Sequence, residues 1–133
     1  MGLFKKLVIA IFISTATLAA APSVMAAGKI ENQKPAETAI AIDETLAQSE
    51  ATLEAMKAGG EIKAVLADLK KTKTFSKTIE AATTAYIREK ALGSLAKARS
   101  AYKKGKSEEA IVKMTKAVAQ FKELKKIYTD FMN

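Results

Sequence analysis

Residues 91–131 read ALGSLAKARSAYKKGKSEEAIVKMTKAVAQFKELKKIYTDF, and their pattern decides the fold. After Gly105, apolar residues recur at alternating spacings of four and three, which is the period of one helix face. The residues on this face are Ala110, Met114, Ala117, Phe121, Leu124, Tyr128 and Phe131. The matching stripe before the glycine comprises Ala91, Leu92, Leu95, Ala98 and Tyr102. Because glycine readily adopts the left-handed conformation that closes a helix, the stretch predicts two antiparallel helices joined by a short turn.

The second of these helices begins with residues that commonly start a helix. Ser107 is predicted to be the N-cap, where its hydroxyl accepts a hydrogen bond from a free amide of the first turn. Glu108 and Glu109 follow, and their carboxylates lie where the helix dipole is positive. Phe121 lies midway along the apolar stripe, so we expect it in the centre of the bundle. The residues predicted to surround it are Leu46, Leu69 and Leu95.

Residues 1–26 have the layout of a secretory signal peptide. Lys5 and Lys6 give a basic start, residues 7–18 form an apolar run, and small residues precede a predicted cleavage after Ala26. The alternative is a retained membrane anchor. Hydroxyl side chains interrupt the apolar run, which is also shorter than the roughly 20 residues that a spanning helix needs. The sequence therefore predicts a protein exported to the periplasm.

The rest of the chain adds two further helices to the hairpin. Residues 27–35 are polar and without a period, and we expect a flexible lead-in there. The helical domain is predicted to cover residues 36–133, with a first helix from residue 36 to a pair of glycines at 59 and 60. A second helix follows and is expected to break near Thr83-Thr84, since hydroxyl side chains compete for backbone hydrogen bonds. The alternative is one continuous helix over residues 61–104.

The two halves of the domain resemble each other. Aligning Gly59 with Gly105 places Ala55 on Ala101, so the halves have the pattern of a degenerate duplication of one helix–glycine–helix unit. Short turns between consecutive helices favour antiparallel neighbours. The predicted fold is all-α, an up-down-up-down antiparallel four-helix bundle after an N-terminal signal peptide.

The composition excludes much chemistry. The chain contains no histidine and no cysteine. It therefore lacks an imidazole base, a thiolate nucleophile, and the usual ligands of zinc and haem. No serine or threonine lies in a glycine-flanked nucleophile elbow, and no glycine-rich phosphate loop occurs. We predict neither an enzyme nor a bound cofactor.

Carboxylates are the remaining metal ligands. Glu50 and Glu54 lie four residues apart on the first predicted helix, where they could hold a hard cation weakly. We interpret them instead as part of a solvated acidic face that meets the basic helices. A carboxylate-based metal carrier is the least favoured of three functions considered.

Lysine is the distinctive residue, and charge is unevenly distributed. Residues 36–58 hold five acids and one base, whereas residues 61–133 hold seventeen bases and eight acids. Nine of these bases lie near helix ends that an up-down-up-down bundle brings to one end of the molecule. They are Lys70, Lys71, Lys73, Lys77, Arg88, Lys90, Lys122, Lys125 and Lys126. Such a cluster is a candidate anion-binding patch, although lysine-rich faces often serve solubility alone.

Two functions follow from these patterns. The first is an exported, non-enzymatic helical bundle that acts as a binding or structural module for a protein or an anionic component of the envelope. The second is a peripheral envelope protein whose lysine-rich end contacts anionic lipid or another polyanion. Nucleic acid is not the expected partner, because export separates the two and no aromatic residues alternate with the bases.

Two resemblances accompany this pattern. At Ala98, Gly105, Ala110 and Ala117 the hairpin resembles one tetratricopeptide-type unit, with small residues where two helices cross. As a whole the chain is similar to small periplasmic four-helix bundles, such as the cytochrome b562-like proteins and the histidine-rich small metal-binding proteins. That similarity implies the architecture. It does not extend to haem or metal binding, because those families use histidines that this chain lacks.

Overall fold

The structure, a computed structural model, describes residues 34–133 of the chain. The predicted signal peptide, its cleavage site and most of the predicted lead-in lie outside the described residues. Four α-helices and one short 3-10 helix make up the described part. They are α3 (Pro35–Lys57), α4 (Ile62–Lys77), η1 (Ala82–Thr84), α5 (Ala85–Lys103) and α6 (Ser107–Met132).

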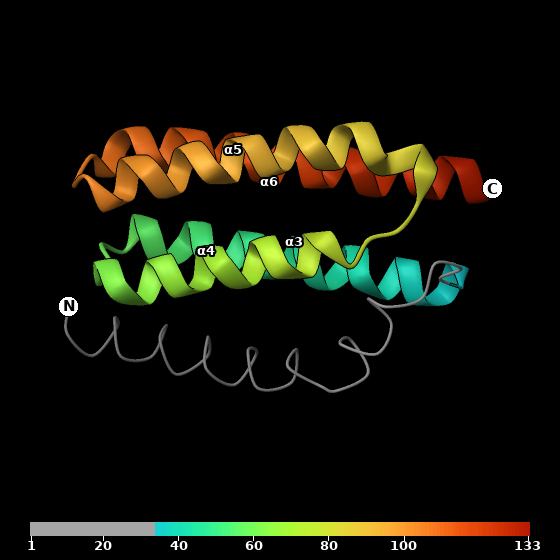
Figure 1. Cartoon of the computed structure of the whole chain (residues 1–133), viewed down its shortest axis with the longest axis horizontal. Helices are drawn as coiled ribbons and strands as arrows, with labels where there is room; N and C mark the ends of the chain where they lie inside the picture. Colours follow the sequence, from blue (N-terminus) through green and yellow to red (C-terminus); the bar gives the residue numbers. More distant parts are fainter. Residues whose placement is uncertain (1–33) are drawn as a thin grey trace.

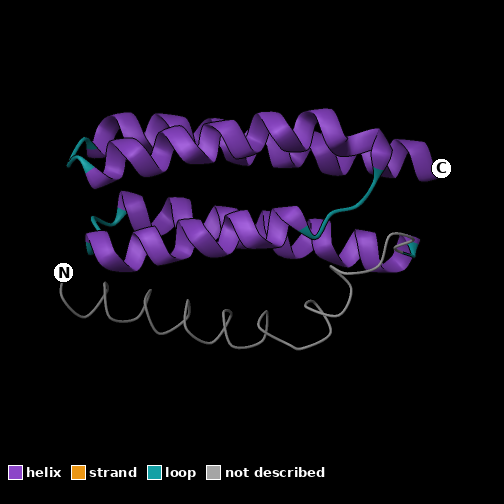
Figure 2. Ribbon diagram, in the orientation of Figure 1, coloured by secondary structure: helices purple, strands orange, loops and turns teal. Residues whose placement is uncertain are grey.

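The four long helices form a closed antiparallel bundle of two hairpins, α3–α4 and α5–α6 (Figure 1). Each helix packs against two neighbours, with α6 against α3 and α4 against α5 completing the ring, so α4 and α6 are diagonal to each other. Both glycine turns lie at one end of the bundle, and the connection between the hairpins lies at the other end with the C-terminus (Figure 2). The predicted all-α four-helix fold is confirmed.

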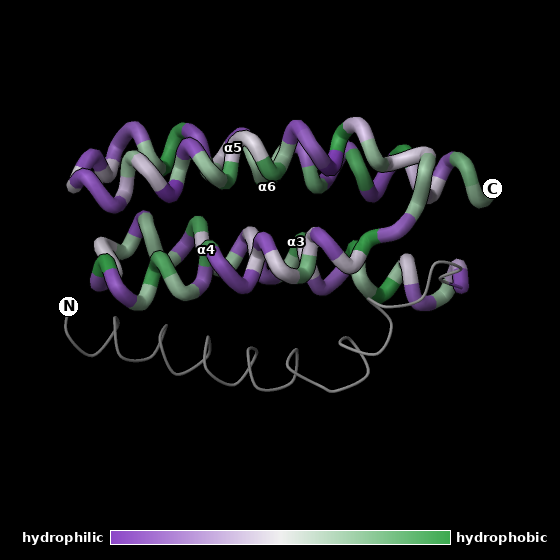
Figure 3. The backbone as a smooth tube through the Cα atoms, viewed as in Figure 1, coloured by the Kyte–Doolittle hydropathy of each residue, from purple (hydrophilic) through white to green (hydrophobic). Residues whose placement is uncertain are grey.

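The core follows the predicted apolar stripes along most of their length. Figure 3 shows hydrophobic and hydrophilic residues side by side along every helix, as expected of helices with one buried face. Phe121 is 1% exposed at the centre of α6, within one hydrophobic cluster that also includes residues of all the other helices. Phe131 is 66% exposed, so its predicted place in the core is wrong. The hydroxyl of Tyr128 donates to the Pro35 carbonyl at 3.0 Å, which marks the level where α3 begins, and Phe131 lies one turn beyond it.

The buried face of α3 is more polar than its apolar pattern indicates. Thr45, Ser49 and Thr52 are fully buried, and Thr72 of α4 faces them from the neighbouring helix with no exposed surface. Each threonine hydroxyl donates to a carbonyl of its own helix, at 2.7 to 3.0 Å. The hydroxyls of Thr52 and Thr72 also lie 3.2 Å apart, a polar contact between α3 and α4. These side chains can be buried because their polar atoms are paired.

The two glycine turns have the same geometry. Gly59 and Gly105 have φ of 70° and 79°, in the left-handed region. In each turn the amide of the following residue donates to a carbonyl five positions back, to Ala55 in the first turn and to Ala101 in the second, both at 2.9 Å. These are the hydrogen bonds of the Schellman motif. The residue pairs aligned by the predicted duplication thus occupy equivalent positions.

Two predicted helix starts are one residue off. Lys106, not Ser107, is the N-cap of α6, and no side chain caps the helix there. The Schellman turn uses only Gly105 and Lys106. The carbonyl of Lys106 accepts the first hydrogen bond of the helix, from the Ala110 amide, at 2.9 Å, so the helix starts directly after Lys106. The bundle also begins at Pro35 rather than at residue 36, since proline suits the first position of a helix.

The predicted break at Thr83-Thr84 is confirmed, and the connection between the hairpins extends back from there to residue 78. α4 ends at Lys77, six residues before Thr83, and the alternative of one helix over residues 61–104 is wrong. The Thr78 hydroxyl donates to the Phe75 carbonyl at 2.6 Å at this end. Ile79 follows in the connection with no exposed surface, so its side chain belongs to the core even though its backbone is not helical.

Phe121→Ala is expected to leave the protein barely folded. Truncating a buried phenylalanine costs about 3–5 kcal/mol, and a domain of this size has about 5–15 kcal/mol of stability in total. The neighbouring Lys122→Ala should change stability by less than about 0.5 kcal/mol, because its side chain is exposed. Thermal and urea unfolding followed by circular dichroism measure both. An alanine variant at 121 that melts like the wild type would contradict the closed core.

Alanine substitutions at Gly93 and Gly105 should have opposite effects. A Cβ at either position meets no atom within 4 Å, so packing is unaffected and only backbone conformation differs. Gly93 lies inside α5 with ordinary helical geometry, and Gly93→Ala should stabilise by about 0.5–1 kcal/mol. Gly105→Ala should destabilise by about 1 kcal/mol, because its φ is 79°. Urea unfolding of the two variants gives the signs directly, and two shifts of equal sign would contradict this assignment.

Candidate functional site: the α4–α5 groove

Positive charge is concentrated on α4 and α5. Together these helices carry ten bases and two acids, whereas α3 carries five acids and one base. The bases of α4 are Lys63, Lys70, Lys71, Lys73 and Lys77, and those of α5 are Arg88, Lys90, Lys97, Arg99 and Lys103. Because α4 and α5 are neighbours in the ring, the two sets share one side of the bundle.

Three of the nine predicted patch residues lie on α6 and are engaged in ion pairs. The ammonium of Lys125 lies 2.8 Å from Asp43 and that of Lys122 lies 4.0 Å from Glu50, both across the seam with α3. Lys126 pairs with Asp130 one turn along α6, at 2.7 Å. Hydrogen bonds to these aspartates raise the pKa of Lys125 and of Lys126. These lysines meet carboxylates of the same molecule, and α6 is diagonal to α4.

Arg88 and Lys90, near the start of α5, also have partners. Arg88 donates to the carbonyl of Ile79 in the connection, and its guanidinium lies 3.5 Å from the carboxylate of Glu89. The ammonium of Lys90 lies 5.0 Å from the ring centre of Tyr86, a cation–π contact. Arg88 therefore helps to hold the connection between the hairpins.

The remaining four predicted residues all lie on α4 and point to different surroundings. Lys71 lies close enough to Asp68 for its charge to act on that carboxyl. Lys77 lines a shallow cavity at the end of the bundle, which also contains Arg88 and Glu80. Lys70 and Lys73 line a larger groove between α4 and α5. The predicted patch is thus divided, and its α4 part lies over this groove.

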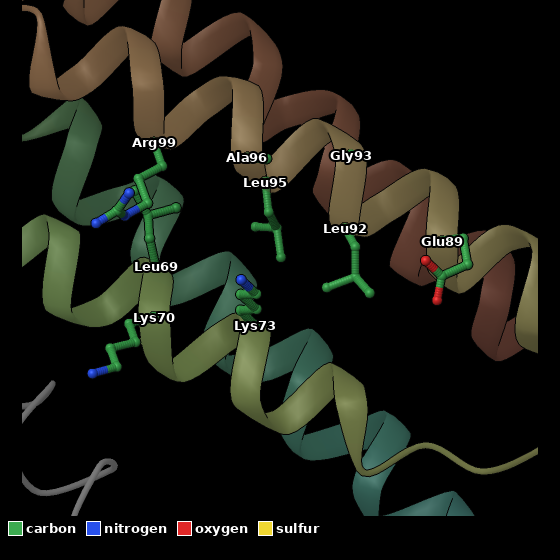
Figure 4. A pocket seen from close by; sticks show the side chains of 9 residues that line it. All are labelled: Leu69, Lys70, Lys73, Glu89, Leu92, Gly93, Leu95, Ala96 and Arg99. Carbon is green, nitrogen blue, oxygen red and sulfur yellow. The ribbon is translucent and has the colours of Figure 1, made fainter.

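The α4–α5 groove has a volume of about 620 Å³, within the range of ligand sites in proteins. Lys70 and Lys73 line it from α4 and Arg99 lines it from α5, and Figure 4 shows Arg99 directed toward α4 and Lys70 directed away from α5. Leu69 and Leu95 are buried at its floor, beside the half-exposed Leu92. The groove therefore combines three cationic side chains with an apolar floor.

Small residues of α5 also line the groove. Gly93 and Ala96 lie on its wall, and a Cβ built on Gly93 would meet nothing within 4 Å. Of the neighbouring pairs in the ring, α4 and α5 are packed least closely. Small side chains that a partner helix does not approach leave open space between the two helices.

The electrostatics of the groove favour an anion. Its one carboxylate, Glu89, lies 3.5 Å from the Arg88 guanidinium. Among residues 34–133, no carboxylate lies within 4.0 Å of the charged groups of Lys70, Lys73 or Arg99. Cations that lack a nearby counter-charge attract anions.

The carboxylates proposed for metal binding have lysine neighbours. Glu50 lies 4.0 Å from Lys122, and Glu54 lies 3.6 Å from Lys57. In the described part of the chain, no group of three or more acidic, histidine or cysteine side chains is placed to hold a metal ion. No helix of residues 34–133 combines the length and the hydropathy that crossing a membrane requires.

Sequence reasoning missed Arg99 and Gly93 as groove residues. Arg99 lies eleven residues after Arg88, toward the other end of α5, and the stripe pattern marks neither it nor Gly93 as special. Antiparallel pairing of α4 with α5 brings Arg99 opposite Leu69 (Figure 4). The number of residues that separates each position on α4 and α5 from the connection at 78–84 predicts which of them lie opposite each other. Using that number requires the end of α4, and α4 ends at Lys77, six residues before Thr83.

Comparisons of the chain with known protein families, curated proteins and solved structures find no match.

Asp68→Asn is expected to stabilise the protein above pH 6. Burial raises the pKa of the half-buried Asp68 carboxyl from 3.8 to about 6, while the charge of Lys71 opposes the rise. Between these values the folded state retains a proton that the unfolded state has lost, so stability falls as pH rises. The full shift corresponds to about 3 kcal/mol, which partial exposure reduces to about 1 kcal/mol.

Urea unfolding at pH 4, 5, 6 and 7 measures this effect. The stability of Asp68→Asn relative to the wild type should increase between pH 4 and pH 6 and remain higher at pH 7. Asp130→Asn, at an exposed position of α6, is the matched control. The opposite result would be a wild-type stability that increases from pH 4 to pH 6, with no such increase in Asp68→Asn. That result would contradict a raised pKa of Asp68.

Proposed function

We propose that this protein is an exported, non-enzymatic binding module that recognises an anionic partner through the α4–α5 side of its bundle. The observation that carries the proposal is the set of three cations, Lys70, Lys73 and Arg99, that line one groove with no carboxylate of the described residues within 4.0 Å of their charged groups. Export is supported by the sequence pattern of residues 1–26. The periplasm is the corresponding compartment.

The contrast between the two sides of the bundle supports this choice of surface. On the α3–α6 side, lysines of α6 meet Asp43 and Glu50 of α3, so positive and negative charges offset each other. On the α4–α5 side, ten bases accompany two acids, and none of the ion pairs in the described residues joins these two helices. An anionic partner is therefore attracted to one side of the molecule.

The second candidate function is contact with an anionic membrane surface through the end opposite the glycine turns. Tyr86, Phe131 and Met132 are 74%, 66% and 48% exposed there. Lys90 lies about one turn after Tyr86 on α5, and Lys126 lies about one and a half turns before Phe131 on α6. Exposed apolar side chains beside bases are typical of proteins that lie on anionic bilayers.

Charge reversal on α4 tests the proposal. Lys70→Glu/Lys73→Glu should weaken binding of the folded protein to inorganic polyphosphate by about tenfold at low salt, with the difference shrinking as salt rises. Lys113→Glu/Lys116→Glu, on α6, makes the same change in net charge away from the groove and should weaken binding by less than about threefold. Fluorescence anisotropy with labelled polyphosphate measures both variants.

Equal losses in the two double variants would show that net charge alone drives binding, and the α4–α5 side would be rejected. Cosedimentation with phosphatidylglycerol vesicles separates the second candidate. Binding to vesicles that depends on Phe131 and ignores the α4 reversals would favour the membrane-facing end.

A further inference from the structure

We infer that the α4–α5 groove binds a single-chain anionic amphiphile, with its acidic group between Lys73 and Arg99 and its chain extended past Leu95 and Leu92 over Gly93. This inference rests on the proposed function and names the class of ligand. The inference follows from the order of side chains along the groove, because the side chains at one end differ from those at the other.

Figure 4 shows this order. Arg99 points from α5 toward α4 at the end nearer the glycine turns, and Lys73 lies between the two helices farther along α4, whereas the Lys70 side chain is directed away from α5. Leu92 points from α5 toward α4 in the other half of the groove, and Glu89 lies beyond it. A ligand that matches the groove is therefore anionic at one end and uncharged along the rest of its length.

The apolar part of the groove accepts a hydrocarbon chain. Leu92 is half-exposed and presents its side chain to the open space, above the buried Leu69 and Leu95. The methylene groups of Lys70 and Lys73 add apolar surface along the α4 wall, since lysine buries its stem while its ammonium stays in water. A chain lying there removes apolar surface from water on both sides.

The acidic end of the groove limits the ligand to one anionic group. A second carboxylate at the far end of the chain would approach Glu89, and like charges repel in a partly desolvated site. Glu89 lies 3.5 Å from Arg88, which reduces that repulsion without supplying a free cation inside the groove. The groove should therefore prefer a fatty monoacid to a diacid of the same length.

Gly93 keeps the chain path open. A Cβ at this position meets no atom within 4 Å, and the next residue on the same wall is Ala96. A leucine at position 93 would project into the groove without a clash in the bundle. Gly93→Leu is thus a blocking variant that leaves the core unchanged. Ala119→Leu, at an exposed position of α6, is its matched control.

The experiment is isothermal titration of the folded protein with decanoate below its micelle concentration, beside butanoate, decanol and decanedioate. Decanoate should bind at one site, and the other three ligands at least about tenfold more weakly. Butanoate lacks the long chain, decanol lacks the negative charge, and decanedioate carries a second carboxylate that would approach Glu89. Gly93→Leu and Arg99→Gln should each weaken decanoate binding by about tenfold, whereas Ala119→Leu and Lys116→Gln should change it by less than about twofold. Thermal melting confirms that every variant is folded.

Decanol binding as tightly as decanoate would overturn the role of the cations. Butanoate binding as tightly, or a Gly93→Leu variant that binds like the wild type, would overturn the apolar path. The absence of decanoate binding together with polyphosphate binding that depends on Lys70 and Lys73 would reject the amphiphile and retain the proposed function. If neither probe depends on these residues, both conclusions fail.

Discussion

The close approach of α5 and α6 is the constraint on which the rest of the bundle depends. Ala91, Ala98, Ala110 and Ala117 are fully buried between these helices, which are the most closely packed pair. Small side chains let helix axes approach, and the larger residues at the margins then set where the other helices lie. Because α5 presents its alanines to α6, its opposite side meets α4 less closely, and the groove is the space that remains.

The same thin core explains the polar face of α3. A bundle rich in alanine has little apolar volume, so threonine and serine occupy positions that leucine fills elsewhere. Their hydroxyls donate to carbonyls one turn earlier, as Thr45 does to Ala41 at 2.7 Å, and the cost of burying a polar atom is thereby offset. The hydroxyl contact between Thr52 and Thr72 also favours one alignment of α3 against α4, since any sliding of the helices would leave both groups without it.

Ring order turns an uneven charge sequence into two different surfaces. The acidic helix α3 has α4 and α6 as neighbours, and its described ion pairs with another helix go to α6. Of the bases on α4 and α5, Lys70, Lys73 and Arg99 line the groove, and solvent reduces the repulsion between their charges. One seam with paired opposite charges, α3–α6, and one basic seam without ion pairs, α4–α5, therefore arise in the described part of the domain. The second seam is the natural surface for an anionic partner.

The sequence by itself determined the helices, their antiparallel order and the residues of the α5–α6 interface, because these depend on local periodicity and on glycine turns such as Gly105. It also marked Lys70 and Lys73 as part of a basic cluster. Only the tertiary structure decided which bases remain without acidic neighbours. Lys125 and Lys73 look alike in sequence, and the difference is that the ammonium of Lys125 lies 2.8 Å from Asp43, whereas Lys73 lines the groove between α4 and α5. Pairing across helices and the empty space beside Gly93 depend on contacts between residues far apart in the chain, and local pattern carries no information about them.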